Sequence, residues 1–176
     1  MQHRDTGNDS QVRSVIAANL QTLRQGLELL RQIDDRLYVA TLPHFSYGIG
    51  SHFRHCLDSF QCFLQHLASG QIDYDRRSRD ELTAVDRACA MARIAETMEL
   101  LERSVTHDQP LQARLDSPHY ADSSALRELQ FLLSHTIHHY ALVALALRLQ
   151  GFAPDAEFGV APSTLEYWKE EARCVR

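Results

Sequence analysis

The stretch Phe131-Leu-Leu-Ser-His-Thr-Ile-His-His-Tyr-Ala-Leu-Val-Ala-Leu-Ala-Leu147 is among the most apolar in the chain, and it decides the fold class. Its pattern begins near Ala125 and stops before Gly151 and Pro154, two residue types that end helices. We therefore predict a helix from about Ala125 to Gln150. Its composition makes it the most buried helix of the protein.

Four other segments show the periodicity of amphipathic helices. Apolar residues recur every three or four positions from Val12 to Leu37, from Ile49 to Leu67 and from Ala88 to Val105, and a short final helix is expected from about Thr164 to Arg173. No segment has the strict alternation of a half-buried strand. Four long helices with short connections predict an all-α fold, an up-down-up-down four-helix bundle with a short C-terminal helix.

Length and composition indicate an ordinary globular protein. The 176 residues favour a single domain over residues 10–176, preceded by a polar, disordered tail over residues 1–9. No apolar run approaches the roughly 20 residues of a membrane span, and the tail lacks the apolar core of a secretory signal. We expect a cytoplasmic protein that does not bind membranes. The four cysteines form no Cys-x-x-Cys pair, which argues against a zinc ribbon or a disulfide framework.

Charge argues against a nucleic-acid partner. The formal net charge is −5, and no long basic run is present to neutralise phosphates. The densest basic cluster is Arg76, Arg77 and Arg79, which alternates with four acidic residues, Asp73, Asp75, Asp80 and Glu81. The alternation indicates a solvated loop with salt bridges.

Histidines on two of the predicted helices suggest a metal site. His135 and His139 lie four residues apart, so both rings project from one helix face and can share an ion. A third ligand is available on the second helix from His52 or His55, and spacing alone leaves both open. His138 points about 100° away from His139, which favours a packing or second-shell role.

Three neutral imidazoles with open coordination positions suit zinc, nickel or iron with bound water, an arrangement typical of catalytic centres. The competing interpretation is a set of core histidines hydrogen-bonded to carbonyls or to Tyr140.

Two short motifs resemble those of the DinB-like superfamily. Gly50-Ser-His-Phe-Arg-His55-Cys-Leu-Asp58 resembles its helix-two motif, in which a glycine near the helix start precedes a metal-binding histidine and, three residues later, an aspartate. Ser134-His-Thr-Ile-His-His139 resembles its pair of histidines on helix four. The resemblance spans about Val12 to Gln150 and implies a metal-binding four-helix bundle.

The resemblance also implies roles for individual residues. It assigns the metal triad to His55, His135 and His139, which makes His52 and His138 second-shell residues. Two carboxylates, Asp58 and Glu128, become further second-shell candidates.

Superfamily members include S-transferases that use low-molecular-weight thiols such as bacillithiol or mycothiol. The resemblance therefore implies a divalent-metal-dependent thiol S-transferase, with a small-molecule thiol and an electrophile as partners. Two alternatives stay open: a metal-dependent hydrolase that uses the same open site, and a non-catalytic metal-binding or stress-related bundle protein, whose site would be occluded. The sequence does not identify catalytic residues beyond the metal ligands.

The surplus of apolar residues after Tyr140 suggests a homodimer, because the helix is apolar almost all round. The alternative is that the final helix, with Leu165, Tyr167 and Trp168, covers the additional apolar face of this helix within the same chain.

Overall fold

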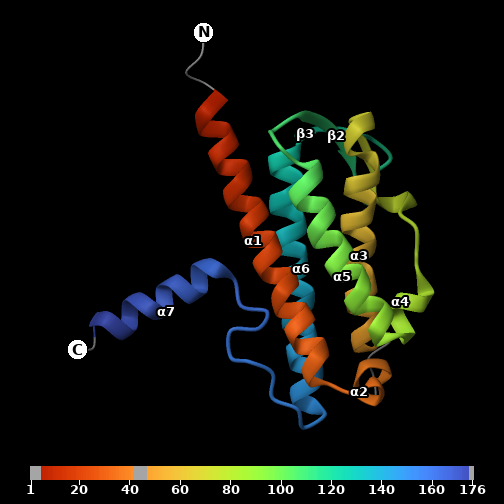
Figure 1. The fold of residues 1–176 in the computed structure, drawn as a ribbon, viewed down its shortest axis with the longest axis vertical. Helices are drawn as coiled ribbons and strands as arrows, with labels where there is room; N and C mark the ends of the chain where they lie inside the picture. The colour runs from red at the N-terminus through yellow and green to blue at the C-terminus, as the bar shows by residue number, and fades with distance from the viewer. Residues whose placement is uncertain (1–4, 42–46, 175–176) are drawn as a thin grey trace.

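The computed structural model describes residues 5–41 and 47–174, which are predominantly helical. Four long helices lie side by side: α1 (Asp5–Gln32), α3 (Ile49–His66), α5 (Arg87–Ser104) and α6 (Ala125–Leu149) (Figure 1). The shorter helices are α2 (Asp35–Val39), α4 (Glu81–Val85) and α7 (Pro162–Cys174), with 3-10 turns η1 (Leu67–Ser69) and η2 (Tyr74–Arg76). The predicted helices are present, except that the one predicted from Val12 to Leu37 is divided into α1 and α2 by the non-helical residues 33–34. The tail predicted over residues 1–9 lies partly outside the described residues, and α1 already includes residues 5–9.

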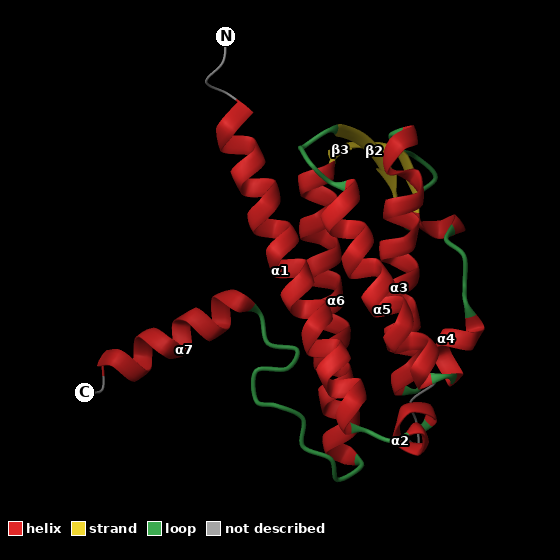
Figure 2. Cartoon of the chain, in the orientation of Figure 1, coloured by secondary structure: helices red, strands yellow, loops and turns green. Residues whose placement is uncertain are grey.

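A small three-stranded sheet lies at one end of the long helices, which corrects the all-α expectation (Figure 2). Its strands are β1 (Gln71–Asp73), β2 (Pro110–Arg114) and β3 (Ala121–Ser124), in the order β1-β2-β3. β1 pairs parallel with β2, and β2 pairs antiparallel with β3. Strands of three to five residues are too short to show a period-two pattern, which is why the sequence did not reveal them.

The sheet fixes the direction of three helices. β1 follows α3, β2 follows α5, and β3 leads directly into α6, so the C-terminal ends of α3 and α5 meet the N-terminal end of α6. α1 runs with α6, because Asn19 near the middle of α1 donates to the Leu129 carbonyl near the start of α6. At the other end, Arg87 at the start of α5 donates to the Leu30 carbonyl near the end of α1.

These directions correct the up-down-up-down prediction. α3 and α5 run the same way, and α1 and α6 run the opposite way. The reason is the long connection over residues 67–86, which returns along the bundle before α5 begins (Figure 1). Only short connections force consecutive helices to be antiparallel. Residues 77–80 form the extended part of this connection, hereafter the return segment.

The core lies between the four long helices. Buried apolar side chains of α1, α3, α5 and α6 form it, among them Leu23, Leu30, Phe53, Phe60, Phe63, Ile94, Leu129 and Leu132. Gly50 allows α4 to pack closely against α3, since a Cβ at this position would lie 2.0 Å from the Ala84 carbonyl oxygen. The glycine of the sequence motif therefore has a packing role.

The C-terminal part follows α6 back along the bundle and then leaves it. Phe158 stacks on Tyr140 with ring centroids 4.8 Å apart, which attaches the segment before α7 to the core. α7 itself extends away from the long helices (Figure 1). Trp168 is 47% exposed, so this helix does not cover the apolar surface of α6. Within the described residues, no helix is long and apolar enough to cross a membrane.

Candidate metal centre

Histidines of α3 and α6 face one another in two layers. The Nε2 atoms of His55 and His135 lie 3.0 Å apart, and the Nδ1 atoms of His52 and His139 lie 2.9 Å apart. The higher-numbered histidine of α3 faces the lower-numbered histidine of α6, because the two helices are antiparallel. One possible ligand atom from each of His55, His135 and His139 lies within 4.8 Å of the other two. The three residues assigned by the sequence motifs are therefore brought together.

The arrangement of these rings fits a divalent ion. A tetrahedral zinc with nitrogen ligands at 2.0–2.1 Å holds those nitrogens about 3.3 Å apart. The nitrogens of the three rings span separations from 3.0 Å to less than 4.8 Å, which small side-chain rotations bring to that value. Three imidazoles leave at least one coordination position for an exogenous ligand.

Burial keeps the cluster neutral at physiological pH. Desolvation lowers the pKa of His55 to about 4 and that of His135 to about 4, with further lowering from neighbouring positive groups such as Arg77. The pKa of His139 falls to about 3, again mainly through burial and then through the surrounding histidines. Only a neutral imidazole offers a lone pair to a cation, so the neutrality of these rings at pH 7 favours metal binding.

His52 is placed to orient His139. Because their Nδ1 atoms form a hydrogen bond, one ring donates and the other accepts. A His139 ring that donates through Nδ1 keeps its Nε2 lone pair free, which is how a neighbour outside the coordination sphere fixes a metal-binding tautomer. Burial lowers the pKa of His52, so this ring is also neutral and able to accept. His138 is exposed, with its ring 5.4 Å from that of His139.

The aromatic ring of Phe131 covers His135. The two rings stack with centroids 5.4 Å apart, and Phe131 also contacts Tyr74. Within the described residues, the buried Nδ1 of His135 has no hydrogen-bond partner. The ring is thus held by packing on one side and by His55 on the other.

The two candidate carboxylates belong to separate networks. Asp58 is buried and forms ion pairs with Arg93 at 3.2 Å and with Arg54 at 4.0 Å. Glu128 is buried beside Tyr74, whose hydroxyl donates to it at 2.9 Å. Both networks reach the cluster only through intervening side chains, and the second-shell roles of Asp58 and Glu128 stay predictions.

Arg77 is a site residue that the sequence interpretation missed. Its Nη2 donates to the Nδ1 of His55 at 3.1 Å, and its Nη1 donates to the carbonyl of Tyr74 at 2.6 Å. The neighbouring Arg76 behaves as expected for a solvated loop, because it is 83% exposed and pairs with Asp73. Alternating charges gave no signal that one of the arginines turns inward.

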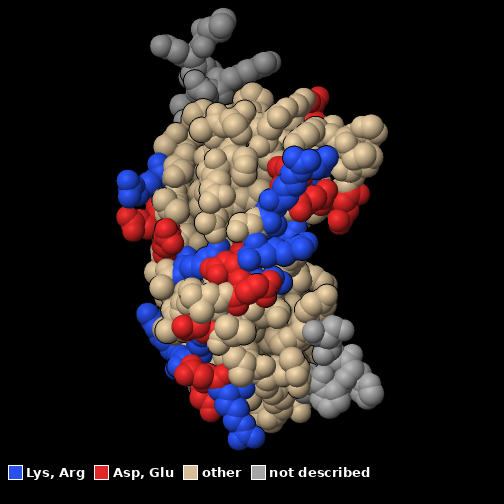
Figure 3. Space-filling view, turned by 90° about the vertical axis from the view of Figure 1, so that its right-hand side faces the viewer, with Lys and Arg blue, Asp and Glu red and all other residues tan. Residues whose placement is uncertain are grey.

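A pocket of about 560 Å³ opens beside the cluster. It is lined by α3, α6 and the return segment, through Tyr47, Ser51, His52, Arg54, His55, Arg77, Arg79, Glu81 and His139. Figure 3 shows the side of the molecule that carries the return segment, where basic and acidic side chains intermingle across the middle of the face. The histidine cluster is therefore open to small molecules.

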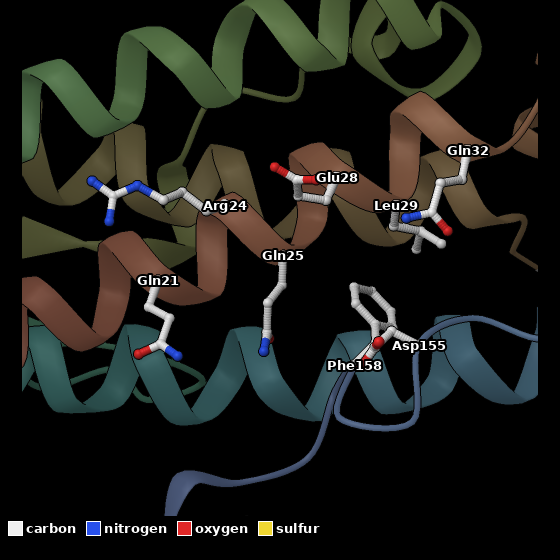
Figure 4. A pocket seen from close by; sticks show the side chains of 8 residues that line it. All are labelled: Gln21, Arg24, Gln25, Glu28, Leu29, Gln32, Asp155 and Phe158. Atoms are coloured by element: carbon white, nitrogen blue, oxygen red, sulfur yellow. The ribbon is translucent and has the colours of Figure 1, made fainter.

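A second hollow of about 320 Å³ lies between α1 and the segment before α7 (Figure 4). Its lining includes Gln21, Gln25, Gln32 and Phe158, and contains no histidine or cysteine among the described residues. Its charged side chains are two carboxylates, Glu28 and Asp155, and the guanidinium of Arg24. The imidazoles that favour transition metals lie instead in the histidine pocket.

Fold and site together define a helical-bundle protein with a three-histidine cluster beside a pocket that two of the three, His55 and His139, line. Residues 18–143 match the DinB superfamily, and the chain belongs to that superfamily. The structure is similar to that of a DinB-like protein from Bacillus subtilis, with a TM-score of 0.59, 18% identity, and coverage of 80% of this chain and 93% of that one.

The sequence is also similar to part of FK506-binding protein 5 from Rhizopus delemar. The two are 34% identical over 109 residues, which is 57% of this chain. The match covers 28% of the fungal protein, so the chain corresponds to a fraction of its length.

Proposed function

We propose that His55, His135 and His139 bind a divalent metal ion, with zinc, nickel and iron as the candidates. Three observations support this: the convergence of the rings within 4.8 Å, their lowered pKa values, and the orienting contact from His52. Membership of the DinB superfamily supports it independently. All-nitrogen ligand sets of this kind suit these three metals better than magnesium or calcium, which prefer oxygen.

We further propose that the loaded protein is a cytoplasmic enzyme that transfers a low-molecular-weight thiol to an electrophile. A divalent metal held by His55, His135 and His139 would lower the pKa of a thiol bound to it and favour the thiolate. The protein's own residues supply the rest: His52 orients a ligand ring, Phe131 excludes water from one side, and the pocket walls hold the second reactant near the histidines.

The open pocket is the observation on which the catalytic proposal depends. A non-catalytic metal-binding protein would be expected to enclose its ion, whereas His52, His55 and His139 line a cavity of about 560 Å³. A volume of this size accommodates a small molecule beside the cluster. A metal-dependent hydrolase would use the same opening, and the two activities differ in whether thiol or water is consumed.

Metal content tests the first proposal. Protein purified without a histidine tag is stripped with chelator, reloaded with zinc, nickel or iron, and measured by elemental analysis. We expect about one ion per chain for the wild type and loss of stoichiometric binding in His135→Ala and His139→Ala. An exposed histidine in the loop after α5 supplies the matched control, His107→Ala, which should bind like the wild type. Full metal content in both cluster variants would overturn the assignment.

A panel assay tests the second proposal. Loaded and metal-free protein are incubated with an aryl chloride or epoxide electrophile and a series of low-molecular-weight thiols, and thioether formation is measured. We expect turnover that requires both the thiol and the metal. Product formation by water alone would indicate the hydrolase, and absence of metal-dependent turnover with every thiol would refute the transferase.

A further inference from the structure

The pocket beside the histidine cluster carries an excess of positive charge. Its lining contains three arginines, Arg54, Arg77 and Arg79, and one carboxylate, Glu81. A chain with a formal charge of −5 therefore has a locally cationic pocket.

The three arginines differ in how their charge is balanced. Arg54 is neutralised within the protein, since it lies 2.8 Å from Glu81 and 4.0 Å from the buried Asp58. In the part of the chain that the structure describes, no carboxylate lies within ion-pair distance of Arg77 or Arg79. Two guanidinium groups thus line the pocket without an acidic partner.

Arg77 is held in place although it lacks a counter-ion. Its two described contacts, to the Tyr74 carbonyl and to His55, are with neutral acceptors. A guanidinium has five N–H donors, so donors remain for a ligand. Its side chain is half-buried and reaches His55 of α3, whereas the side chain of Arg79 is exposed. An incoming group would therefore meet Arg79 first and Arg77 deeper, beside His55.

We propose that this pocket binds a small molecule through a carboxylate or similar oxyanion, with Arg77 and Arg79 as its charge partners. Planar guanidinium groups match carboxylate and phosphate oxygens through paired hydrogen bonds. An anion bound here places the remainder of the molecule against His52, His55 and His139. In naming the substrate class, the inference rests on the proposed function, whereas anion binding itself needs no metal.

Calorimetric titration of metal-free protein at pH 7 with acetate, succinate and inorganic phosphate tests this proposal. Succinamide, which has the shape of succinate without its charge, serves as the matched ligand. We expect saturable binding of at least one anion and none of succinamide. Absence of saturable binding for all three anions, or equal binding of succinamide, would overturn the proposal.

Variants assign the binding to the two arginines. Arg77→Gln should weaken anion binding by about tenfold, with a smaller loss in Arg79→Gln, because each removes a charge-assisted contact. Arg77→Lys should retain part of the affinity. Arg103→Gln, which alters an exposed arginine of α5 paired with Glu99, is the control and should match the wild type. Unchanged affinity in a folded Arg77→Gln protein, checked by circular dichroism, would refute the assignment.

The two proposals fail separately. Anion binding by metal-free protein that shows no metal-dependent turnover would remove the transferase and leave the anion pocket. Thiol turnover that is unaffected in Arg77→Gln, together with no anion binding, would remove the anion pocket and leave the enzyme.

Discussion

Acid should destabilise the metal-free protein through the histidine cluster. His55, His135 and His139 have pKa values of about 4, 4 and 3 in the folded chain, against an ordinary value of 6.5. A histidine whose pKa is lowered by folding gives its full stability above the unfolded value. That stability is lost as the pH falls from about 6.5 towards 4, because the unfolded chain takes up protons that the folded chain cannot.

The size of the effect follows from proton uptake. At pH 5 each unfolded imidazole holds close to one proton and each folded one holds about a tenth or less, so unfolding takes up about 2.7 protons at these three sites. The free energy of unfolding should then fall by roughly 3–4 kcal/mol for each pH unit near pH 5. Zinc should oppose this loss, since it competes with protons for the same nitrogens.

Urea denaturation of chelator-treated protein between pH 7 and 4.5 measures the slope. His135→Gln should reduce the slope by about one proton, roughly 1.4 kcal/mol per pH unit. The exposed His107→Gln control should keep the wild-type slope. Identical slopes for wild type and His135→Gln would show that the cluster is not protonated on unfolding, and the reasoning from burial would be wrong.

Four further outcomes are expected. Gly50→Ala should lower the free energy of unfolding by about 1–3 kcal/mol in urea denaturation, because its Cβ would collide with the Ala84 carbonyl oxygen. His52→Ala should weaken zinc binding by about 10–100-fold in competition titrations, since it removes the hydrogen-bond partner of His139. Arg77→Gln should raise zinc affinity, by about tenfold or less, because a positive charge beside the cluster is lost. Light scattering at several concentrations should show a homodimer, given the exposed apolar residues of α6, and a constant monomer mass would contradict that expectation.

The sequence was sufficient to predict the long helices and to place two of the cluster histidines on one helix face. Periodic apolar residues mark the long helices, and a separation of four places His135 and His139 on one face regardless of how the helices are connected. Spacing alone left His52 and His55 equivalent. The structure explains why: both contact α6, the first through His139 and the second through His135.

Helix direction and the pocket wall could not be predicted from periodicity. A helix pattern reads the same in either direction, so the expectation that the second and fourth helices are parallel rested on loop length, and the connection over residues 67–86 is long enough to reverse it. The inward turn of Arg77 depends on a local contact with the Tyr74 carbonyl and on a contact with His55, which lies 22 residues earlier in the chain. Local charge alternation contains no information about such contacts.

The return segment has a consequence for how this protein can diversify. The same stretch that reverses the chain between α3 and α5 forms one wall of the pocket, while the histidines are anchored in helices. Within it, the exposed Ser78 and Arg79 can vary and alter which molecules enter the pocket, whereas Arg77 contacts His55 and Asp80 caps α4, so these two belong to the scaffold. Ligand preference among such proteins should follow this short loop more closely than it follows overall identity.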